Sequence, residues 1–238
     1  MAALGPSQWA VHIVLASCIM TKTDTQLKLD IEQELRWDPS VNDAQIGVTV
    51  DKGAVSLLGA VDTYAQKWAA EAATKRVSGV RTVAQDLTVK ILSDHRRTDP
   101  EIAAAVLSAL KWDVYVPDAV TAKVEQGRVT LEGQVAGNYQ RDAAERAVGY
   151  LAGIVGISNA ITIKPQAAAG QVREKILSAL QRQATADTHS IHIATSGGKV
   201  TLTGSASSWQ SIEDAANAAW AAPGVTEVVD QVKMAMTF

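Results

Sequence analysis

A seven-residue pattern bounded by glycines occurs three times along this chain. It reads Gly-x-Val-x-Leu-x-Gly, and its copies run from Gly53 to Gly59, from Gly127 to Gly133 and from Gly198 to Gly204. The first two closing glycines are 74 residues apart and the last two are 71 apart. A second set of glycines, each followed by Val or Ile, has the same spacings of 74 and 71 residues, at Gly79, Gly153 and Gly224. Self-similarity at a fixed period indicates tandem copies of one unit, so the 238 residues are expected to form three small domains.

Each copy is predicted to begin with an amphipathic helix. In the second copy, Thr98 to Glu101 combine a capping residue, a proline in the first turn and a Glu three residues after the Thr, which is typical of a helix N-terminus. Apolar residues then recur at every fourth position and share one face. They are Leu27, Ile31 and Leu35 in the first copy, Ile102, Val106 and Leu110 in the second, and Val172, Ile176 and Leu180 in the third.

A hairpin, a second helix and a last strand are predicted to follow. Apolar residues alternate with polar or small ones on both sides of the Gly53 turn, which indicates two strands. An alanine-rich helix from Tyr64 to Val77 comes next, and final strands are expected at Leu87–Ile91, Ala160–Ile163 and Val229–Met234. The predicted order in each copy is α-β-β-α-β, an α+β fold.

The recurring glycines are predicted to serve the backbone rather than a ligand. Tight turns and helix C-caps need a positive φ, which is cheap only for glycine. Gly79, Gly153 and Gly224 are expected to cap the second helices. The nine positions predicted to be structural are Gly53, Gly59, Gly79, Gly127, Gly133, Gly153, Gly198, Gly204 and Gly224.

The module boundaries are expected at residues 22–92, 97–164 and 169–236, after an N-terminal extension of residues 1–21. The linkers at 93–97 and 165–170 are short, so the modules cannot move far apart. A unit of about 70 residues has a thin margin of stability on its own. Contacts between neighbouring modules are therefore favoured.

With these residues in view, the chain resembles the BON domain family, named for bacterial osmotically induced periplasmic and nodulation proteins. The Gly-x-Val-x-Leu-x-Gly hairpin and the later Gly-Val turn carry the resemblance over nearly the whole chain. It implies two helices packed on one face of a small three-stranded sheet. It also implies a stress-related, transport-associated role in attaching to phospholipid or cell-envelope surfaces, without a catalytic centre or cofactor.

The first residues leave the compartment open. Trp9 to Leu15 is apolar and Leu15 to Cys18 matches a lipoprotein cleavage box, which would place the protein in the periplasm or on the envelope. However, no Lys or Arg precedes this run, as a secretory signal normally requires. Translation from Met20 would instead leave a cytoplasmic protein, and an upstream extension is the favoured interpretation. The run is also too short to span a bilayer.

Few residues suggest catalysis or metal binding. Cys18 is the only cysteine, so a disulfide or cysteine-based zinc site within the chain is excluded. His189 and His192 are three apart beside a strand and point to opposite faces. Ser207 and Ser208 have no nearby histidine, and Glu32 with Glu34 is typical of a solvated helix face. We expect a non-enzymatic protein without metal or cofactor.

Two tryptophans and the charge balance bear on the partner. Trp37 and Trp112 occupy equivalent positions at the ends of the first helices, each after a basic residue. Such a Trp either contacts a membrane interface or, as we favour, seals the edge of a core. Each module carries a net charge of −1, which gives no support for nucleic acid or for simple attraction to anionic lipid. Attachment to a phospholipid or envelope surface through a local patch is the leading hypothesis, and a soluble cytoplasmic protein-interaction scaffold is the alternative.

Overall fold

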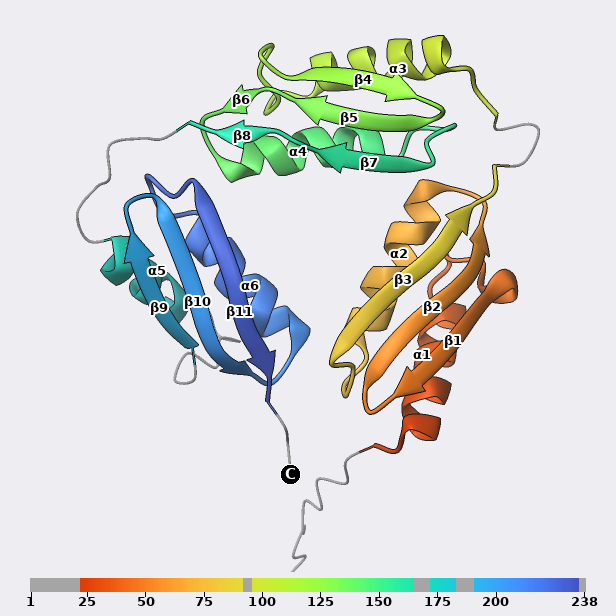
Figure 1. The fold of residues 1–238 in the computed structure, drawn as a ribbon, viewed down its shortest axis with the longest axis horizontal. Helices are drawn as coiled ribbons and strands as arrows, with labels where there is room; N and C mark the ends of the chain where they lie inside the picture. The colour runs from red at the N-terminus through yellow and green to blue at the C-terminus, as the bar shows by residue number, and fades with distance from the viewer. Residues whose placement is uncertain (1–21, 92–95, 165–171, 183–190, 236–238) are drawn as a thin grey trace, which may run out of the picture.

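The computed structural model describes residues 22–91, 96–164, 172–182 and 191–235. These residues form three α+β modules, as predicted (Figure 1). The first module contains α1 (Asp24–Trp37), a 3-10 turn η1 (Asp43–Gln45), β1 (Ile46–Asp51), β2 (Ala54–Val61), α2 (Tyr64–Arg76) and β3 (Thr82–Val89). The second contains α3 (Asp99–Trp112), β4 (Thr121–Glu125), β5 (Arg128–Glu132), β6 (Gln134–Val135), α4 (Asn138–Gly149), β7 (Gly156–Asn159) and β8 (Thr162–Ile163). The third contains α5 (Val172–Arg182), β9 (Ile191–Ser196), β10 (Lys199–Ala206), α6 (Trp209–Trp220) and β11 (Glu227–Met234).

Each sheet has the hairpin's second strand at its centre. In the first module β2 pairs antiparallel with β1 and parallel with β3, and the third module repeats this order. In the second module the corresponding strands are interrupted, so β5 pairs with β7 while β6 pairs with β8. The last strand of the first module begins at Thr82, five residues before the predicted start at Leu87. Its first residues pair with β2 through backbone hydrogen bonds, which the pattern of apolar side chains does not reveal.

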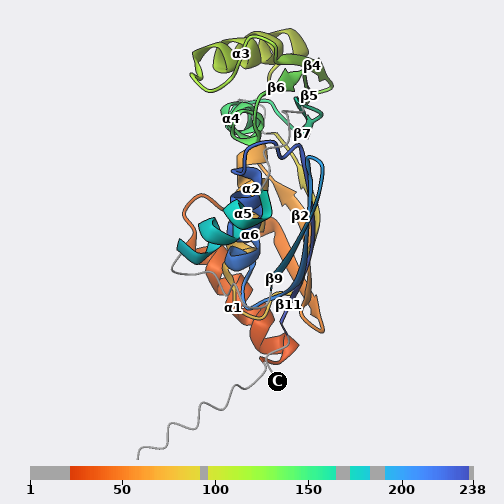
Figure 2. The same cartoon turned by 90° about the vertical axis from the view of Figure 1, so that its left-hand side faces the viewer.

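The helices gather on one side of the three sheets (Figure 2). Each module has its own apolar core between its helices and its sheet. The predicted helix faces supply it, with Leu27, Ile31 and Leu35 buried in the first module. Since burial of one such side chain contributes about 1.5–3 kcal/mol, these stripes hold the first helices on the sheets.

The expectation that Gly79, Gly153 and Gly224 cap the second helices is wrong. The caps are Val77, Tyr150 and Ala221, none of which has a positive φ. Gly79, Gly153 and Gly224 come two or three residues later, in the turn that leads to the last strand. The helices end earlier because a further turn is closed by backbone bonds such as Val80 N to Val77 O, 3.3 Å.

The hairpin turns of the first two modules are held by a carboxylate from the preceding helix. Asp99, at the start of α3, accepts the backbone N–H groups of Gln126 and Gly127 at 2.8 and 2.9 Å. Asp24 does the same for Lys52 and Gly53. Lys52 and Gln126 adopt left-handed φ values of 49° and 51°, which are costly for a residue with a side chain. In the third module Gly197 occupies the equivalent position.

The second helices join the modules into a closed ring (Figure 1). Between the first two modules, the rings of Trp68 and Tyr150 lie 6.2 Å apart. Between the second and third, the guanidinium of Arg141 lies 4.8 Å from the centre of the Trp220 ring. Each contact joins the first half of one second helix to the far end of the next module's second helix.

The third module closes the ring onto the first in the same sense. Trp209, at the start of α6, donates a 2.9 Å hydrogen bond to the carbonyl oxygen of Val80. Its ring also lies 5.6 Å from the ammonium of Lys75, near the end of α2.

Tyr64, which occupies the position of Trp209 in the first module, packs against the core of the second. Burial and the neighbouring carboxylate of Glu145 raise the pKa of Tyr64. Head-to-tail contacts of this kind form rings when the last copy returns to the first.

Candidate functional site

The two repeated tryptophans lie on the surface. Trp37 is 83% exposed and Trp112 is 86% exposed, so the favoured interpretation that they seal a core edge is wrong. The reason is helical geometry, since each Trp follows the last core residue, Leu35 or Leu110, by two positions and therefore points to a different side of the helix. Their contact with an interface stays a prediction.

The surroundings of the two tryptophans differ sharply. Near Trp37, the guanidinium of Arg76 bonds Asp38 at 2.8 Å and Glu34 at 2.9 Å. The hydroxyl of Ser40 also donates to Asp38 at 2.6 Å. The Ser40 hydrogen bond, and next that from Arg76, lower the pKa of Asp38. The first module thus presents its Trp beside a network of charges.

The second module presents its Trp within an apolar face. Leu107 is 70% exposed and Val114 is 89% exposed. Leu107, Lys111 and Trp112 line a shallow hollow of about 480 Å³ together with Ala104 and Ser108. Positions 104, 107, 108 and 111 share one helical face of α3, which carries the exposed Leu107 beside the small residues Ala104 and Ser108 and the cation Lys111.

Two exposed tyrosines contact each other beyond the end of α3. Tyr115 and Tyr139 are both 58% exposed, and their rings meet edge to face with centres 6.1 Å apart. The backbone N–H of Tyr115 bonds the Asp113 carboxylate at 2.9 Å, which fixes the loop. We call Leu107, Trp112, Val114, Tyr115 and Tyr139 the aromatic surface. In Figure 1 α3 lies on the outer side of the ring, away from its centre.

Sequence reasoning found Trp112 but missed the other four members of the aromatic surface. Leu107 follows the core residue Val106 directly and lies off the face of Ile102, Val106 and Leu110, so its exposure was open to prediction from the spacing. A signal was available in the repeat, because the residues that correspond to Leu107 and Tyr115 in the first module are Glu32 and Ser40. Large apolar residues in one copy where another copy has polar ones indicate that the two surfaces differ.

The polar residues considered as chemical groups mostly have structural partners. Ser208 caps α6 by accepting the Ser211 N–H at 3.1 Å. Glu32 pairs with Lys28 at 3.7 Å. His192 is exposed on β9, and Ser207 is exposed before α6. His189 and Cys18 lie outside the described residues, within which no cluster of three or more metal-ligating side chains occurs.

The structural glycines lie at turns and close approaches. At Gly59 a Cβ would collide with the carbonyl oxygen of Gln45, and at Gly133 with that of Ala119. Eight of the nine positions have a positive φ, and Gly198 is the exception. A substitution at Gly59 or Gly133 would therefore move the hairpin.

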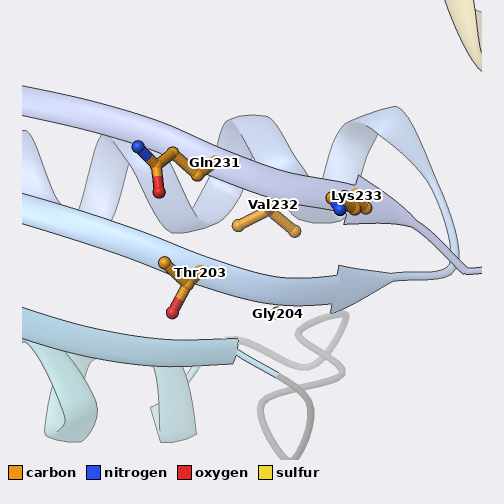
Figure 3. Close-up of a pocket in the computed structure, with 5 residues that line it drawn as sticks. All are labelled: Thr203, Gly204, Gln231, Val232 and Lys233. Carbon is orange, nitrogen blue, oxygen red and sulfur yellow. The ribbon is translucent and has the colours of Figure 1, made fainter.

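A second hollow lies on the third module (Figure 3). Thr203 and Gln231 lie side by side in register on the parallel strands β10 and β11, and Lys233 follows farther along β11. The lining holds a hydroxyl, an amide and an ammonium, a set suited to hydrogen bonding.

Compared with the sequence patterns of known families, the chain matches the BON domain over residues 23–91, 98–165 and 168–236. It belongs to the BON domain family. BON domains are non-catalytic binding domains associated with stress and with membrane or envelope binding. None of the helices in the described ranges has the length and apolar character needed to cross a membrane.

No curated protein matches this BON chain. Among solved structures, it is similar to two chains described as CdsD, a structural protein of the type III secretion system of Chlamydia trachomatis. Both are 15% identical with a TM-score of 0.25. The first match covers 88% of this chain and 92% of the other, and the second, a C-terminal domain, covers 90% and 100%.

Proposed function

We propose that this BON protein is a non-catalytic, stress-related binding protein that attaches to phospholipid or cell-envelope surfaces through its aromatic surface. The observation that carries the proposal is the exposure of five large apolar side chains on one outer part of the second module. Apolar side chains gathered in this way are uncommon on a protein that contacts only water.

The composition of the surface favours a lipid interface. Trp and Tyr are the residues that concentrate where acyl chains meet headgroups, because their rings are apolar and each carries one polar atom. Lys111 can keep its ammonium in the headgroup layer while its stem lies on the apolar face. Asp113 follows Trp112 directly, so attraction between net charges contributes little and insertion of the rings supplies the affinity.

Co-sedimentation with vesicles tests the proposal. The chain should pellet with phosphatidylcholine vesicles, and the change of both Leu107 and Trp112 to Ala should weaken partitioning about tenfold or more, since each buried side chain contributes about 1.5–3 kcal/mol. High salt should have a small effect.

The repeat provides a matched control. Trp37→Ala removes an equally exposed indole from charged surroundings and should leave pelleting unchanged. Absence of lipid-dependent pelleting at low salt would refute the proposal. If the protein instead captures a stoichiometric cytosolic partner, and only Trp112→Ala abolishes that capture, the aromatic surface serves a protein-interaction scaffold.

A further inference from the structure

A cleft of about 460 Å³ lies where the third module closes onto the first. The first module contributes the β1–β2 turn and the start of β3, and the third contributes the start of α6 and the end of β11. Trp209 and Ile212 form part of an apolar wall. The cleft exists only because the ring is closed, since its two sides come from the opposite ends of the chain.

Three cations line this cleft. They are Lys52, Arg81 and Lys233, and among the described residues of the lining Asp51 is the only carboxylate. Within the described part of the chain none of the three cations belongs to an ion pair. The described lining residues therefore sum to +2 on a chain with a net charge of −3, which is a concentrated positive site.

The arginine and the indole are held in place beside each other. The stem of Arg81 covers Gly53, where a Cβ would lie 2.7 Å from the Arg81 Cδ. Its Nη1 lies 3.5 Å from the carbonyl oxygen of Lys52. Trp209 is fixed by its bond to the carbonyl of Val80, the residue before Arg81. A guanidinium and an aromatic ring are therefore presented together before any ligand binds.

The other two junctions show that ring closure alone does not require these charges. The positions equivalent to Lys52, Arg81 and Lys233 are Gln126, Val155 and Thr88 at the junction of the first two modules, and Gly197, Thr226 and Thr162 at the next. One cation does appear in each, at the position of Ala54, as Arg128 or Lys199. Lys199 is paired with Glu227 at 2.7 Å. Three cations together occur only where the third module meets the first.

We propose that this cleft binds a phosphate ester that carries a small apolar or planar group. A guanidinium matches the oxygens of a phosphate through paired hydrogen bonds, and two ammonium groups add charge without demanding a geometry. The Trp209 and Ile212 wall accommodates the organic part of the ester. Because both modules contact it, a bound ester stabilises the closed ring over any open form.

Calorimetric titration of the full chain with phenyl phosphate at low salt tests this site. We expect saturable one-to-one binding that is tighter than that of inorganic phosphate, since the ring adds contact with the apolar wall. Arg81→Gln and Lys233→Gln should each weaken binding about tenfold or more, as charge-assisted hydrogen bonds are lost. Lys233 is exposed, so its substitution should leave the melting temperature unchanged and exclude misfolding as the cause.

Arg128→Gln is the matched control, because it removes one cation from another junction, at the position that Ala54 has in this cleft. It should change the affinity by less than about twofold, since charges this far apart are screened. Absence of phenyl phosphate binding, or equal weakening by Arg128→Gln, would overturn the proposal.

Vesicles that contain phosphatidylglycerol distinguish the source of the ester. If Lys233→Gln lowers pelleting with these vesicles as well as phenyl phosphate binding, the ester is a lipid headgroup. If only phenyl phosphate binding falls, the ester is a soluble molecule. Phenyl phosphate binding does not depend on the aromatic surface, which the Trp112 variant on neutral phosphatidylcholine probes separately.

Discussion

The indole Nε1 of Trp209 donates a 2.9 Å hydrogen bond to the carbonyl oxygen of Val80, which lies 129 residues earlier in the chain. This bond joins the last module to the first. Because Trp209 also packs against the core of the first module, one residue couples the two ends of a chain whose linkers join only neighbouring modules.

Substitution of Trp209 should loosen this junction. Trp209→Phe keeps most of the packing and should cost about 1 kcal/mol, the net value of one hydrogen bond. Trp209→Ala also removes the packing and should cost about 2–4 kcal/mol, with an increase in the radius of gyration measured by X-ray scattering. Trp37→Ala, at an exposed site, should change neither quantity. An unchanged radius for Trp209→Ala would show that the other two junctions suffice to hold the ring.

The hairpin turn of the second module should depend on Asp99. Asp99→Ala leaves two backbone N–H groups without their carboxylate and should reduce the free energy of unfolding by about 1–2 kcal/mol in denaturant titrations. Adding Gln126→Gly should recover part of that loss, since glycine removes the cost of the left-handed φ. A double variant less stable than Asp99→Ala would contradict this account of the turn.

Acid should weaken the ionic network at the end of α1. The pKa of Asp38 is lower in the folded protein than its ordinary value, chiefly through the Ser40 hydrogen bond and next through Arg76. The stabilisation is therefore present above the unfolded pKa of about 3.9 and is lost as the pH falls through the folded pKa. Ser40→Ala and Arg76→Gln should each raise the pKa of Asp38, measured by NMR titration, because each removes a hydrogen bond to the carboxylate. An unchanged pKa in either variant would show that the removed bond does not contribute.

One repeated position should allow the third module to be stabilised. The side-chain amides of Gln85 and Asn159 donate to the backbone carbonyls of Lys67 and Arg141 at 2.9 and 3.2 Å, and so tie the last strand to the second helix. Asp230 occupies this position in the third module and has no N–H to donate. Asp230→Asn should therefore raise the free energy of unfolding by about 0.5–1.5 kcal/mol. Asn159→Asp is the reverse change and should lower it, and a gain in both variants would exclude a shared geometry.

The modules themselves could be predicted because their signals are local. The spacing of Leu27, Ile31 and Leu35 places three side chains on one helix face whatever else the chain does, and the structure buries all three. Alternation around the Gly53 turn likewise predicts a hairpin from neighbouring residues alone. The equal spacing of the glycines then indicates that this unit occurs three times.

The aromatic surface was only partly predictable. The spacing of Ile102, Val106 and Leu110 assigns Val106 to the core and places Leu107 and Trp112 off that face. It does not say which side chains gather beside them, and the contact between Tyr115 and Tyr139 depends on how the loop after α3 meets α4.

What the sequence alone determined is the identity of the repeated unit, because helix period, strand alternation and turn glycines act over a few residues. What only the tertiary structure decided is how the units meet. The bond from Trp209 to Val80, the contact of Tyr115 with Tyr139 and the cations around the Trp209 cleft arise between separate segments of the chain. Such contacts depend on how the surfaces of folded modules pack against each other, and no local pattern of residues predicts them.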